Sequence, residues 1–536
     1  MAVIIDKKYK WRHVDAEGFE YWYIGSAGAV KKYISFYKNN SEATVDEIKN
    51  ALLNLVGNFA FIIKKGKKVI AAVDKIRSYP LFYFHQKDKL TVSNSARALK
   101  NEYGLDKIDK KSFLEFQMAG FVTGRNTLYK DLYQIQAGEF ITWNQDVKKQ
   151  ESARYYLFYS DEEREGREDD HIEELDRVTD QIFNRVIEDA NDKAIWVPLS
   201  GGLDSRLVLC KLKKLGYENL HTFSYGPINN YEAKWAKIVA DKVDVPWIFI
   251  PYTVKEIRDF FFSQTRKDYW LFSGEYCTLP FMVDEFAIHT LKTNKLIDDT
   301  SIFVNGQSGD FISGGHSYGY HLNALPDDSQ IYDPDTIVNA IIKKHYSLNN
   351  LLLTKEKIQT IADKIYSILK LHRGMTLSGQ QIAKYYEWWE WQERQSKYVV
   401  NGQRSYDFFG YKWALPLWAD EYLLFWDKIN YPFRFKQNLY KAYLDRMDFY
   451  GLFRKFKSVV WNWQGLSMLA IPAGAIIKRL LGINASKKFY HYAGYFGKYQ
   501  NHYAPFGLKQ WLINAGKLKN PIALYVNTSL KENRIN

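Results

Sequence analysis

Cysteine is nearly absent from this chain, whose 536 residues include only Cys210 and Cys277. So few thiols exclude a disulfide scaffold and are typical of a reducing compartment, so we expect a cytoplasmic protein. No run of about 18 apolar residues occurs, which excludes a membrane-spanning helix. The N-terminus has no basic region followed by a long apolar run, so we expect no signal peptide. Residues 466–477 are apolar but short and include Pro472; we expect them to be buried rather than interfacial.

The charge is unbalanced, with 74 Lys and Arg against 61 Asp and Glu, a net charge of +13. Nucleic acid, an anionic membrane surface or acidic substrates such as ATP would each suit this excess. The lysines are scattered without a long basic block, so we expect no nucleic-acid partner and favour a solvated basic surface. The last 60 residues are basic and aromatic; a carbohydrate- or nucleic-acid-binding surface is an alternative there to a plain basic one.

A chain of this length is too long for one hydrophobic core, so two or three domains are expected. Residues 1–155 are predicted to be β-rich, with a helix over 45–55 and a charged turn, 64–68, between two apolar runs. Stacked antiparallel sheets with helices fit this pattern. The predicted strands are residues 59–63, 69–73, 81–85 and 89–93.

A polar stretch, residues 160–170, is predicted to be a linker to a second domain at 165–536. There strands and helices alternate, which predicts a parallel sheet with ligands at the carboxyl ends of its strands. Beyond residue 335 the chain is expected to be mostly helical. Residues 385–394 are expected to form a core-packing helix with an acidic face, or a wall of a substrate pocket. The predicted strands are 194–199, 220–226, 247–250 and 301–304, and the predicted helices are 171–190, 206–215, 231–243 and 282–291.

The most informative stretch is Ser200-Gly201-Gly202-Leu203-Asp204-Ser205, between a predicted buried strand and a predicted helix that ends at Gly216. Glycines let backbone N–H groups approach phosphate oxygens, serines donate hydrogen bonds, and a helix N-terminus favours an anion. Asp204 only accepts hydrogen bonds, so we expect it to hold Mg²⁺ rather than to touch phosphate. The stretch is neither a Walker loop nor a Gly-x-Gly-x-x-Gly motif.

A second glycine-rich loop, residues 305–316, follows the strand predicted at 301–304 and carries one aspartate, Asp310. Both loops are expected at the same edge of one sheet. There Asp204 and Asp310 would together bind one Mg²⁺ on the phosphates. A surface loop rich in turn residues is the alternative interpretation.

Ser200–Ser205 resembles the pyrophosphate loop of the ATP pyrophosphatase superfamily, and the order of motifs resembles the glutamine-dependent asparagine synthetases (class B). The resemblance spans nearly the whole chain. It implies an α/β two-domain protein, in which an antiparallel α+β sandwich of the N-terminal-nucleophile type precedes a parallel synthetase domain like the adenine-nucleotide α-hydrolases, with a helical C-terminal part. The matching stretches are residues 56–61, 74–83, 136–139, 200–205, 223–226 and 305–315, with Glu232, and more weakly Arg404 and residues 415–420.

Two departures from the family pattern change the expected function. The family's glutaminase uses a cysteine exposed after removal of the initiator Met, whereas this chain has Ala2, which cannot supply a thiolate. We therefore predict no glutaminase activity; β-lactam synthetase-type relatives also lack this cysteine. In the second loop, Gln307 replaces a glutamate tied in the family to the amino-acid substrate, and a glutamine can neither carry charge nor take a proton. This puts aspartate as the substrate in doubt.

The resemblance implies an ATP-dependent synthetase that adenylates a carboxylate, releases pyrophosphate and transfers an amine to the acyl group. The expected partners are a small-molecule carboxylate, with a uronic-acid sugar favoured, and an amine or ammonia, free or from a separate ammonia-supplying protein. A homodimer is left open. The expected cofactors are ATP and Mg²⁺. The implied sites are catalytic Lys455, Lys457 and Gln307; nucleotide-binding Leu199, Ser200, Gly201, Gly202, Asp204, Ser205, Ser224, Tyr225 and Gly306; and metal-binding Asp204 and Asp310.

Several other functions remain open on the sequence alone. One is asparagine synthesis from free ammonia, and another is lactam-type closure of an amide within one molecule. A third is a pseudoenzyme that binds nucleotide without releasing pyrophosphate. A basic nucleic-acid-binding module is the weakest, since it would require strongly salt-dependent binding.

Overall fold

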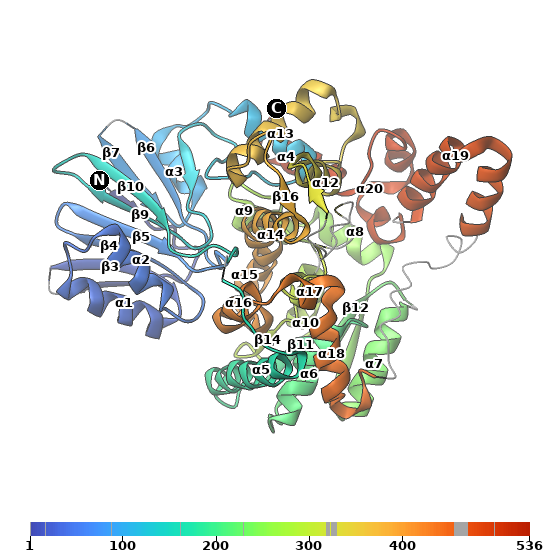
Figure 1. The fold of residues 1–536 in the computed structure, drawn as a ribbon, viewed down its shortest axis with the longest axis horizontal. Helices are drawn as coiled ribbons and strands as arrows, with labels where there is room; N and C mark the ends of the chain where they lie inside the picture. Colours follow the sequence, from blue (N-terminus) through green and yellow to red (C-terminus); the bar gives the residue numbers. More distant parts are fainter. Residues whose placement is uncertain are drawn as a thin grey trace.

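The computed structural model describes residues 2–16, 18–86, 88–160, 162–228, 230–282, 284–317, 322, 330–454, 470–497 and 499–535. The N-terminal sheets lie at one side of the molecule, a parallel sheet with its helices lies centrally, and helices α19 (Ala470–Gly497) and α20 (Tyr499–Asn514) lie at the opposite side (Figure 1). Within these residues, no helix combines the length and the apolar character needed to cross a membrane.

Two stacked sheets form the N-terminal part, and every strand pair in them is antiparallel except β1 with β7. The four-stranded sheet has the order β1 (Ala2–Ile4), β7 (Lys89–Ser93), β6 (Phe82–Gln86) and β8 (Leu132–Gln134). The six-stranded sheet has the order β10 (Lys149–Arg154), β9 (Glu139–Asn144), β5 (Lys68–Val73), β4 (Phe59–Lys65), β3 (Phe19–Gly25) and β2 (Arg12–Ala16). The expected stack of antiparallel sheets is therefore present.

Strand β4 shows why the predicted strands of this part are apolar without alternation. Ala60 and Ile62 pack into the cluster between the two sheets, whereas Phe61 and Ile63 pack against helices on the other face. Because both faces are buried there, residues 59–63 of the strand are all apolar, and the two lysines come at its less buried end. The helices of this part are α1 (Ala27–Asn39), α2 (Val45–Leu53), α3 (Ala96–Tyr103) and α4 (Lys110–Ala119).

The five-stranded sheet that follows the N-terminal part is parallel throughout, as predicted. Its order is β13 (Trp247–Pro251), β12 (Leu220–Gly226), β11 (Ile195–Pro198), β14 (Ile302–Val304) and β17 (Lys412–Ala414). The chain leaves β11 toward β12 on one side and later returns to β14 on the other. Ligands of open parallel sheets bind at such a switch in strand order, beyond the carboxyl ends of the strands.

Helices surround this sheet and fill most of the remaining chain. Helix α5 (Glu168–Ala190) precedes the first strand of the sheet, and between its strands come α6 (Leu203–Lys214), α7 (Tyr231–Val243), α8 (Val254–Phe262), α9 (Gln264–Gly274), α10 (Glu285–Thr293) and α11 (Gly309–Ile312). Later come α12 (Asp335–His345), α13 (Lys355–Leu369), α14 (Gly379–Trp389), α15 (Arg404–Phe409), α16 (Asp420–Asp427), α17 (Tyr431–Arg434), α18 (Asn438–Met447), α19 (Ala470–Gly497), α20 (Tyr499–Asn514) and α21 (Ile522–Glu532).

The shorter elements include one that matters for the site, the π-helix η2 (Glu390–Val399), which continues α14. A small antiparallel pair, β15 (Ile331–Tyr332) with β16 (Leu377–Ser378), stands apart from the sheets. The 3₁₀ turns are η1 (Asn350–Leu352), η3 (Val400–Gln403), η4 (Pro416–Trp418), η5 (Phe435–Gln437) and η6 (Phe449–Gly451).

Two sequence expectations are wrong. The acids of residues 385–394 do not form an exposed face: Glu387, Glu390 and Glu393 are buried, each beside a cation from another turn or element. The segment 466–477 is buried only in part where it is described, because Gly474 is buried but Ile476 is 59% exposed; residues 466–469 lie outside the described residues. The periodicity of a single segment shows neither which distant cations its acids contact nor whether its apolar residues are covered by other elements.

The N-terminal sheets and the later helices share one hydrophobic core. Phe82 of β6, Trp270 of α9 and Tyr525 of α21 belong to a single cluster. An ion pair, Arg266 Nη1 to Glu532 Oε2 at 2.7 Å, fixes the last helix beside α9. The first and last thirds of the chain therefore stabilise each other by packing.

Candidate active site

The first glycine-rich loop links β11 to α6 and is closed by its own serines. Ser205 Oγ accepts a hydrogen bond from the Ser200 N–H at 3.1 Å and lies 3.0 Å from Ser200 Oγ. The Gly202 N–H donates to Ser200 Oγ at 3.1 Å. The loop is thus a compact turn at a helix N-terminus, where unpaired N–H groups and the helix dipole favour an anion.

The second loop approaches the first so closely that only glycine fits at two positions. A Cβ on Gly306 would lie 2.6 Å from the backbone nitrogen of Ser205. A Cβ on Gly309 would lie 2.6 Å from Cγ of Asp204. The structure therefore brings the predicted residues of the two loops together, at the switch between β11 and β14.

Asp204 and Asp310 meet where the loops join. The Asp310 N–H donates to Asp204 Oδ2 at 3.0 Å, and the Tyr440 hydroxyl donates to Asp204 Oδ1 at 2.9 Å. Burial, and then the charge of Asp310, raises the pKa of Asp204 to about 7. Burial acts the same way on Asp310, but the hydrogen bond and charge of His316 outweigh it and lower the pKa of Asp310. Two adjacent carboxylates that oppose each other's ionisation favour a bound cation.

These two carboxylates fit a magnesium ion only in part. The Asp310 side chain is 55% exposed, and each Asp204 oxygen accepts one hydrogen bond and keeps a second lone pair. Across the described ranges no group of three or more His, Cys, Asp or Glu side chains gathers as a metal site. An ion held here would need further oxygen ligands, which phosphates supply.

His316, which the sequence analysis did not select, connects Asp310 to a buried glutamate. Its Nε2 lies 3.0 Å from Asp310 Oδ2 and its Nδ1 lies 2.7 Å from Glu390 Oε1. Burial alone would lower the pKa of His316, but Glu390 and Asp310 raise it to about 9. Lys344 Nζ also lies 3.1 Å from Glu390 Oε2. His316 directly follows Gly314-Gly315. Its position at the end of the second glycine-rich loop is the sequence feature that could have identified it as a site residue.

The predicted adenine residues of β12, Ser224 and Tyr225, are both held by hydrogen bonds of their side chains. Ser224 Oγ donates to the Leu199 carbonyl at 2.6 Å, so this side chain ties β12 to the residue that follows β11. The hydroxyls of Tyr225 and Tyr406 both donate to Asp284, the latter at 2.6 Å. Burial raises the pKa of Asp284. Asp284 was missed because no sequence motif marks it.

Gln307 points to a neighbouring glutamine rather than to a charge. Its Oε1 accepts a hydrogen bond from Gln403 Nε2 at 3.0 Å. Gln403 is 1% exposed, and its Oε1 has no hydrogen-bond partner among the residues that the structure describes. A buried acceptor without a partner is costly, and a donor group of a ligand would satisfy it.

The two predicted catalytic lysines, Lys455 and Lys457, lie outside the described residues. Leu452, just before them in the sequence, accepts a hydrogen bond from Arg206 Nη1 at 2.7 Å. Arg206 Nη2 also donates to the carbonyl of Gly201 at 3.0 Å. One buried arginine thus connects residue 452 to the first loop.

Both cysteines of the chain are buried away from solvent. Burial raises the pKa of Cys210 to about 12 and also raises the pKa of Cys277. A thiol with a raised pKa and no solvent access is a poor nucleophile. Ala2 begins an edge strand, β1, paired with Thr91 of β7.

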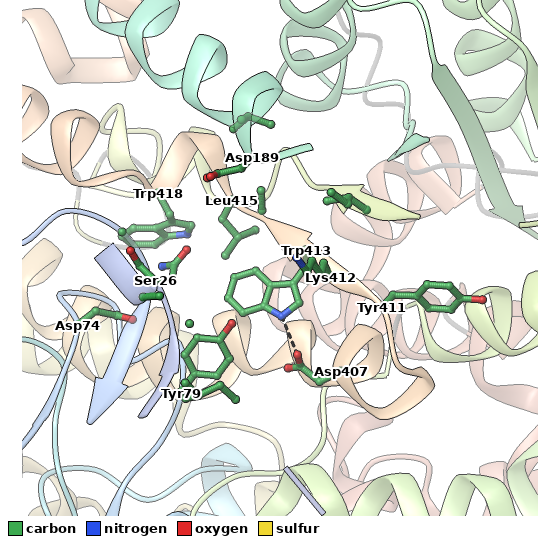
Figure 2. A pocket seen from close by; sticks show the side chains of 18 of the residues that line it. Ser26, Asp74, Tyr79, Asp189, Asp407, Tyr411, Lys412, Trp413, Leu415 and Trp418 are labelled. Carbon is green, nitrogen blue, oxygen red and sulfur yellow. Dashed lines mark hydrogen bonds between the residues drawn. The ribbon is translucent and has the colours of Figure 1, made fainter. Parts of the chain in front are cut away.

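A cavity of about 970 Å³ lies elsewhere, between the N-terminal sheets and β17. Figure 2 shows Tyr79 and Trp413 beside each other in its wall, with ring centroids 5.6 Å apart, and the Trp413 indole donating to Asp407. None of the predicted site residues lines it. Trp418, on its wall, stacks on Phe311 of the second loop at 5.6 Å.

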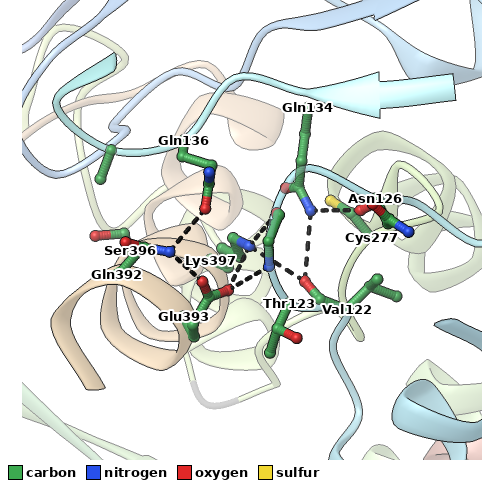
Figure 3. Close-up of polar contacts among 12 residues, drawn as sticks. Val122, Thr123, Asn126, Gln134, Gln136, Cys277, Gln392, Glu393, Ser396 and Lys397 are labelled. Carbon is green, nitrogen blue, oxygen red and sulfur yellow. Dashed lines mark hydrogen bonds and ion pairs between the residues drawn. The ribbon is translucent and has the colours of Figure 1, made fainter. Parts of the chain in front are cut away.

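A buried polar cluster joins the N-terminal part to the π-helix η2 (Figure 3). Lys397 Nζ lies 2.5 Å from Glu393 Oε2 and donates to the Gly124 carbonyl at 2.6 Å. Gln392 Nε2 donates to Gln136 Oε1 at 2.8 Å. Both charged side chains are 0% exposed, and burial lowers the pKa of Lys397. We call Gln136, Gln392, Glu393 and Lys397 the interdomain cluster.

The sequence matches two protein-family models. One, described as asparagine synthase, matches residues 186–442, and the other, described as a glutamine amidotransferase domain, matches residues 43–156. Together they cover more than two thirds of the chain, and the first match includes both glycine-rich loops. A search of curated proteins found no significant match.

Two solved structures are similar at low identity. Glutamine phosphoribosylpyrophosphate amidotransferase from B. subtilis, complexed with ADP and GMP, has 12% identity and a TM-score of 0.18, with 55% of this chain and 63% of that chain covered. A structure of the allosteric regulatory enzyme of purine biosynthesis has 12% identity and a TM-score of 0.17, with 54% of each chain covered. The chain spans less than two thirds of either relative, and scores this low carry no argument here.

Proposed function

Because the chain belongs to the asparagine synthetase family, with a glutamine amidotransferase domain before its ATP-dependent ligase region, we propose that it is an AMP-forming amide synthetase. A substrate carboxylate attacks the α-phosphorus of ATP and pyrophosphate leaves. An amine then attacks the acyl carbon, and AMP leaves. The observation that carries this proposal is the contact of the two loops, which places two carboxylates beside a helix N-terminus.

The roles of the loop residues follow from the groups they present. Backbone N–H groups and hydroxyls of the first loop hold the pyrophosphate part of ATP, and the strand ends beside it line the adenine pocket. The pyrophosphate residues are Ser200, Gly201, Gly202 and Ser205; the adenine residues are Leu199, Ser224, Tyr225 and Gly306.

Asp204 and Asp310 are proposed to hold Mg²⁺, which when bound would neutralise charge on the phosphates. Their adjacency and the exposure of Asp310 support this assignment. His316 holds the Asp310 side chain in place by a hydrogen bond, and Glu390 in turn holds His316. We further propose Lys455 or Lys457 as the cation that stabilises the α-phosphate during attack, because Leu452 is bonded to the arginine that contacts Gly201.

The acceptor is proposed to be a carboxylate other than aspartate, with a uronic-acid sugar favoured. Gln307 offers an amide where a charged group would recognise an ammonium, so a carboxylate that bears hydroxyls and no ammonium group suits it better. The unpartnered Oε1 of Gln403 beside it would accept a hydrogen bond from a sugar hydroxyl.

Nitrogen is proposed to come from free ammonia or from another protein, since neither thiol of the chain is placed to attack glutamine. The first part, residues 1–155, would then be a degenerate N-terminal-nucleophile-type domain. Residues 165–536 would be an ATP pyrophosphatase domain of the adenine-nucleotide α-hydrolase type. Their shared core supports a structural role for the first domain.

The test is ATP–pyrophosphate exchange by the full chain with Mg²⁺, across carboxylates that include glucuronate, galacturonate and aspartate. Exchange with a uronate is expected, and mass spectrometry should show an amide product only after ammonium is added. Asparagine formed at on the order of 1 per second would overturn the proposed acceptor. A product lighter by one water without ammonium would instead indicate closure within one molecule. ATP binding without exchange on any carboxylate would contradict the proposed enzyme.

A further inference from the structure

A long stretch near the C-terminus carries positive charge alone. Residues 449–531 include twelve lysines and arginines and no aspartate or glutamate, although the whole chain has 61 acids. Helices α19 and α20 fall within this stretch and lie at the end of the molecule remote from the N-terminal sheets (Figure 1). A surface without acids suits an anionic partner.

Helix α19 is folded back on itself at Gly482, whose φ of 86° breaks the helical path. Ser486 Oγ donates to the Gly474 carbonyl at 2.9 Å, so the two halves of α19 lie against each other. A Cβ on Gly474 would lie 2.2 Å from Cζ of Tyr490, which shows how closely the halves approach. Residues 480–483 therefore form the tip of a helical hairpin, called the 480–483 tip.

The tip presents apolar side chains to solvent. Leu480 is 74% exposed, Leu481 72% and Ile483 54%. A folded chain gains free energy by burying such side chains, so a compact exposed group of them indicates a surface that another phase or molecule covers.

Basic residues flank the tip on both sides. Lys478, Arg479, Lys487 and Lys488 are all exposed. None of the four forms an ion pair with a carboxylate among the described residues of the chain. Apolar residues at a helical turn with lysine and arginine on each side match the lipid interface, where the apolar groups enter the acyl boundary and the cations stay at the headgroups.

A second exposed apolar set lies on α20, which packs against α8. Leu508, Leu512 and Ile513 of α20 are between 53% and 57% exposed, and Phe262 of α8 is 53% exposed. A nucleic acid would leave these side chains in water. A lipid surface would bury apolar groups and neutralise the lysines together.

We propose that the 480–483 tip and its basic flanks bind the surface of an anionic lipid bilayer, without crossing it. The insertion is peripheral, with Leu480, Leu481 and Ile483 entering the headgroup boundary. This proposal does not depend on the amide-forming reaction proposed for the two glycine-rich loops.

The test is flotation of the full chain with vesicles of phosphatidylcholine alone and of phosphatidylcholine with phosphatidylglycerol at 3:1. Binding is expected to the second kind only, and to weaken as salt is raised. The variant L480S/L481S should bind at least about tenfold less, because two leucines no longer enter the interface. K487E/K488E should bind at least about fivefold less, since each lysine near the surface contributes about 1 kcal/mol.

Matched controls use exposed residues away from the tip. V147S removes an apolar side chain that is 65% exposed in the N-terminal part, and K110E/K111E reverses two exposed charges at the start of α4. Both should bind vesicles like the unchanged chain. Thermal melts should be alike for all four variants.

Three results would overturn the proposal. The first is no flotation above background with either vesicle, or equal loss in the controls. The second is self-association of the unchanged chain in light scattering that L480S/L481S abolishes, which would make the tip an interface between two copies. The third is stronger retention on RNA than on vesicles, unaffected by L480S/L481S.

Discussion

The interdomain cluster and the loop cluster, made of Asp204, Asp310, His316 and Glu390, use similar residues to different ends. Both contact the π-helix η2, through Lys397 and Glu393 in the first and through Glu390 in the second. In the interdomain cluster both charges are 0% exposed, and Lys397 also donates to a backbone carbonyl. In the loop cluster, Asp310 stays 55% exposed. An ion pair without solvent access can only stabilise the fold, whereas one with an exposed carboxylate can also bind a ligand. We call the first kind closed and the second kind open.

The largest expected effect tests whether the open cluster serves the reaction. Asp204→Asn keeps the shape but removes the charge, so pyrophosphate exchange should fall at least about 100-fold. The thermal melt of the metal-free variant should be no lower than that of the unchanged chain. Exchange assays and calorimetric melts on the same preparation check both. Exchange within about threefold of the unchanged chain would remove Asp204 from the proposed metal site.

The next effect tests whether the closed cluster serves stability alone. Glu393→Gln leaves Lys397 buried without its counter-charge, so the free energy of unfolding should fall by about 3–5 kcal/mol. Lys237 and Asp241 form a pair at the same spacing but 54% and 60% exposed, so Asp241→Asn should cost less than about 1 kcal/mol. Urea unfolding of both variants measures the difference. Equal costs would contradict the comparison.

A smaller effect tests the close approach of the two loops. Gly306→Ala puts a methyl group 2.6 Å from a backbone nitrogen. One of the two loops must move to make room for it. We expect a loss of about 1–3 kcal/mol in unfolding free energy, together with weaker exchange. Gly28→Ala is the control: it lies in α1 with nothing within 4 Å of the new atom, and should be neutral or stabilising. Similar melts for the two variants would show that the second loop shifts freely.

The smallest effect is a pH dependence of the metal-free protein. The pKa of Asp204 is raised to about 7 in the fold, above about 3.9 for an unfolded aspartate. Between these values the folded chain holds a proton that the unfolded chain has released, so this group's contribution to stability falls as pH rises. In EDTA, the melting temperature of Asp204→Asn minus that of the unchanged chain should grow from pH 4.5 to 7.5. A constant difference would contradict the raised pKa.

The elements near the site could be predicted from sequence because their signals are local. The strand–loop–helix at 194–215 has an apolar run, a turn sequence and a glycine stop, and the structure confirms it as β11 and α6, with Gly216 at a φ of 84°. The parallel sheet followed from the alternation of strands and helices. The second loop was found for the same reason as the first.

What could not be predicted depends on contacts between distant residues. Glu390 was assigned to the acidic face of a core-packing helix, because the sequence of a single helix shows its charges without their partners. Its partners His316 and Lys344 come from other elements. The exposure of Ile476 likewise depends on how α19 folds back at Gly482. The roles of the predicted site residues, and the domain limits, stay predictions.

The contact between the loops also has a consequence for how the chain folds. Asp204 and the Asp310 N–H are 106 residues apart and come together only when β14 docks beside β11. Closing so long a segment is slow, and no local element of the chain can form the site early. A partly folded chain therefore lacks the proposed nucleotide site, and a ligand of the two loops would stabilise only the complete fold. Nucleotide-dependent protection from proteolysis would then report completed folding as well as occupancy.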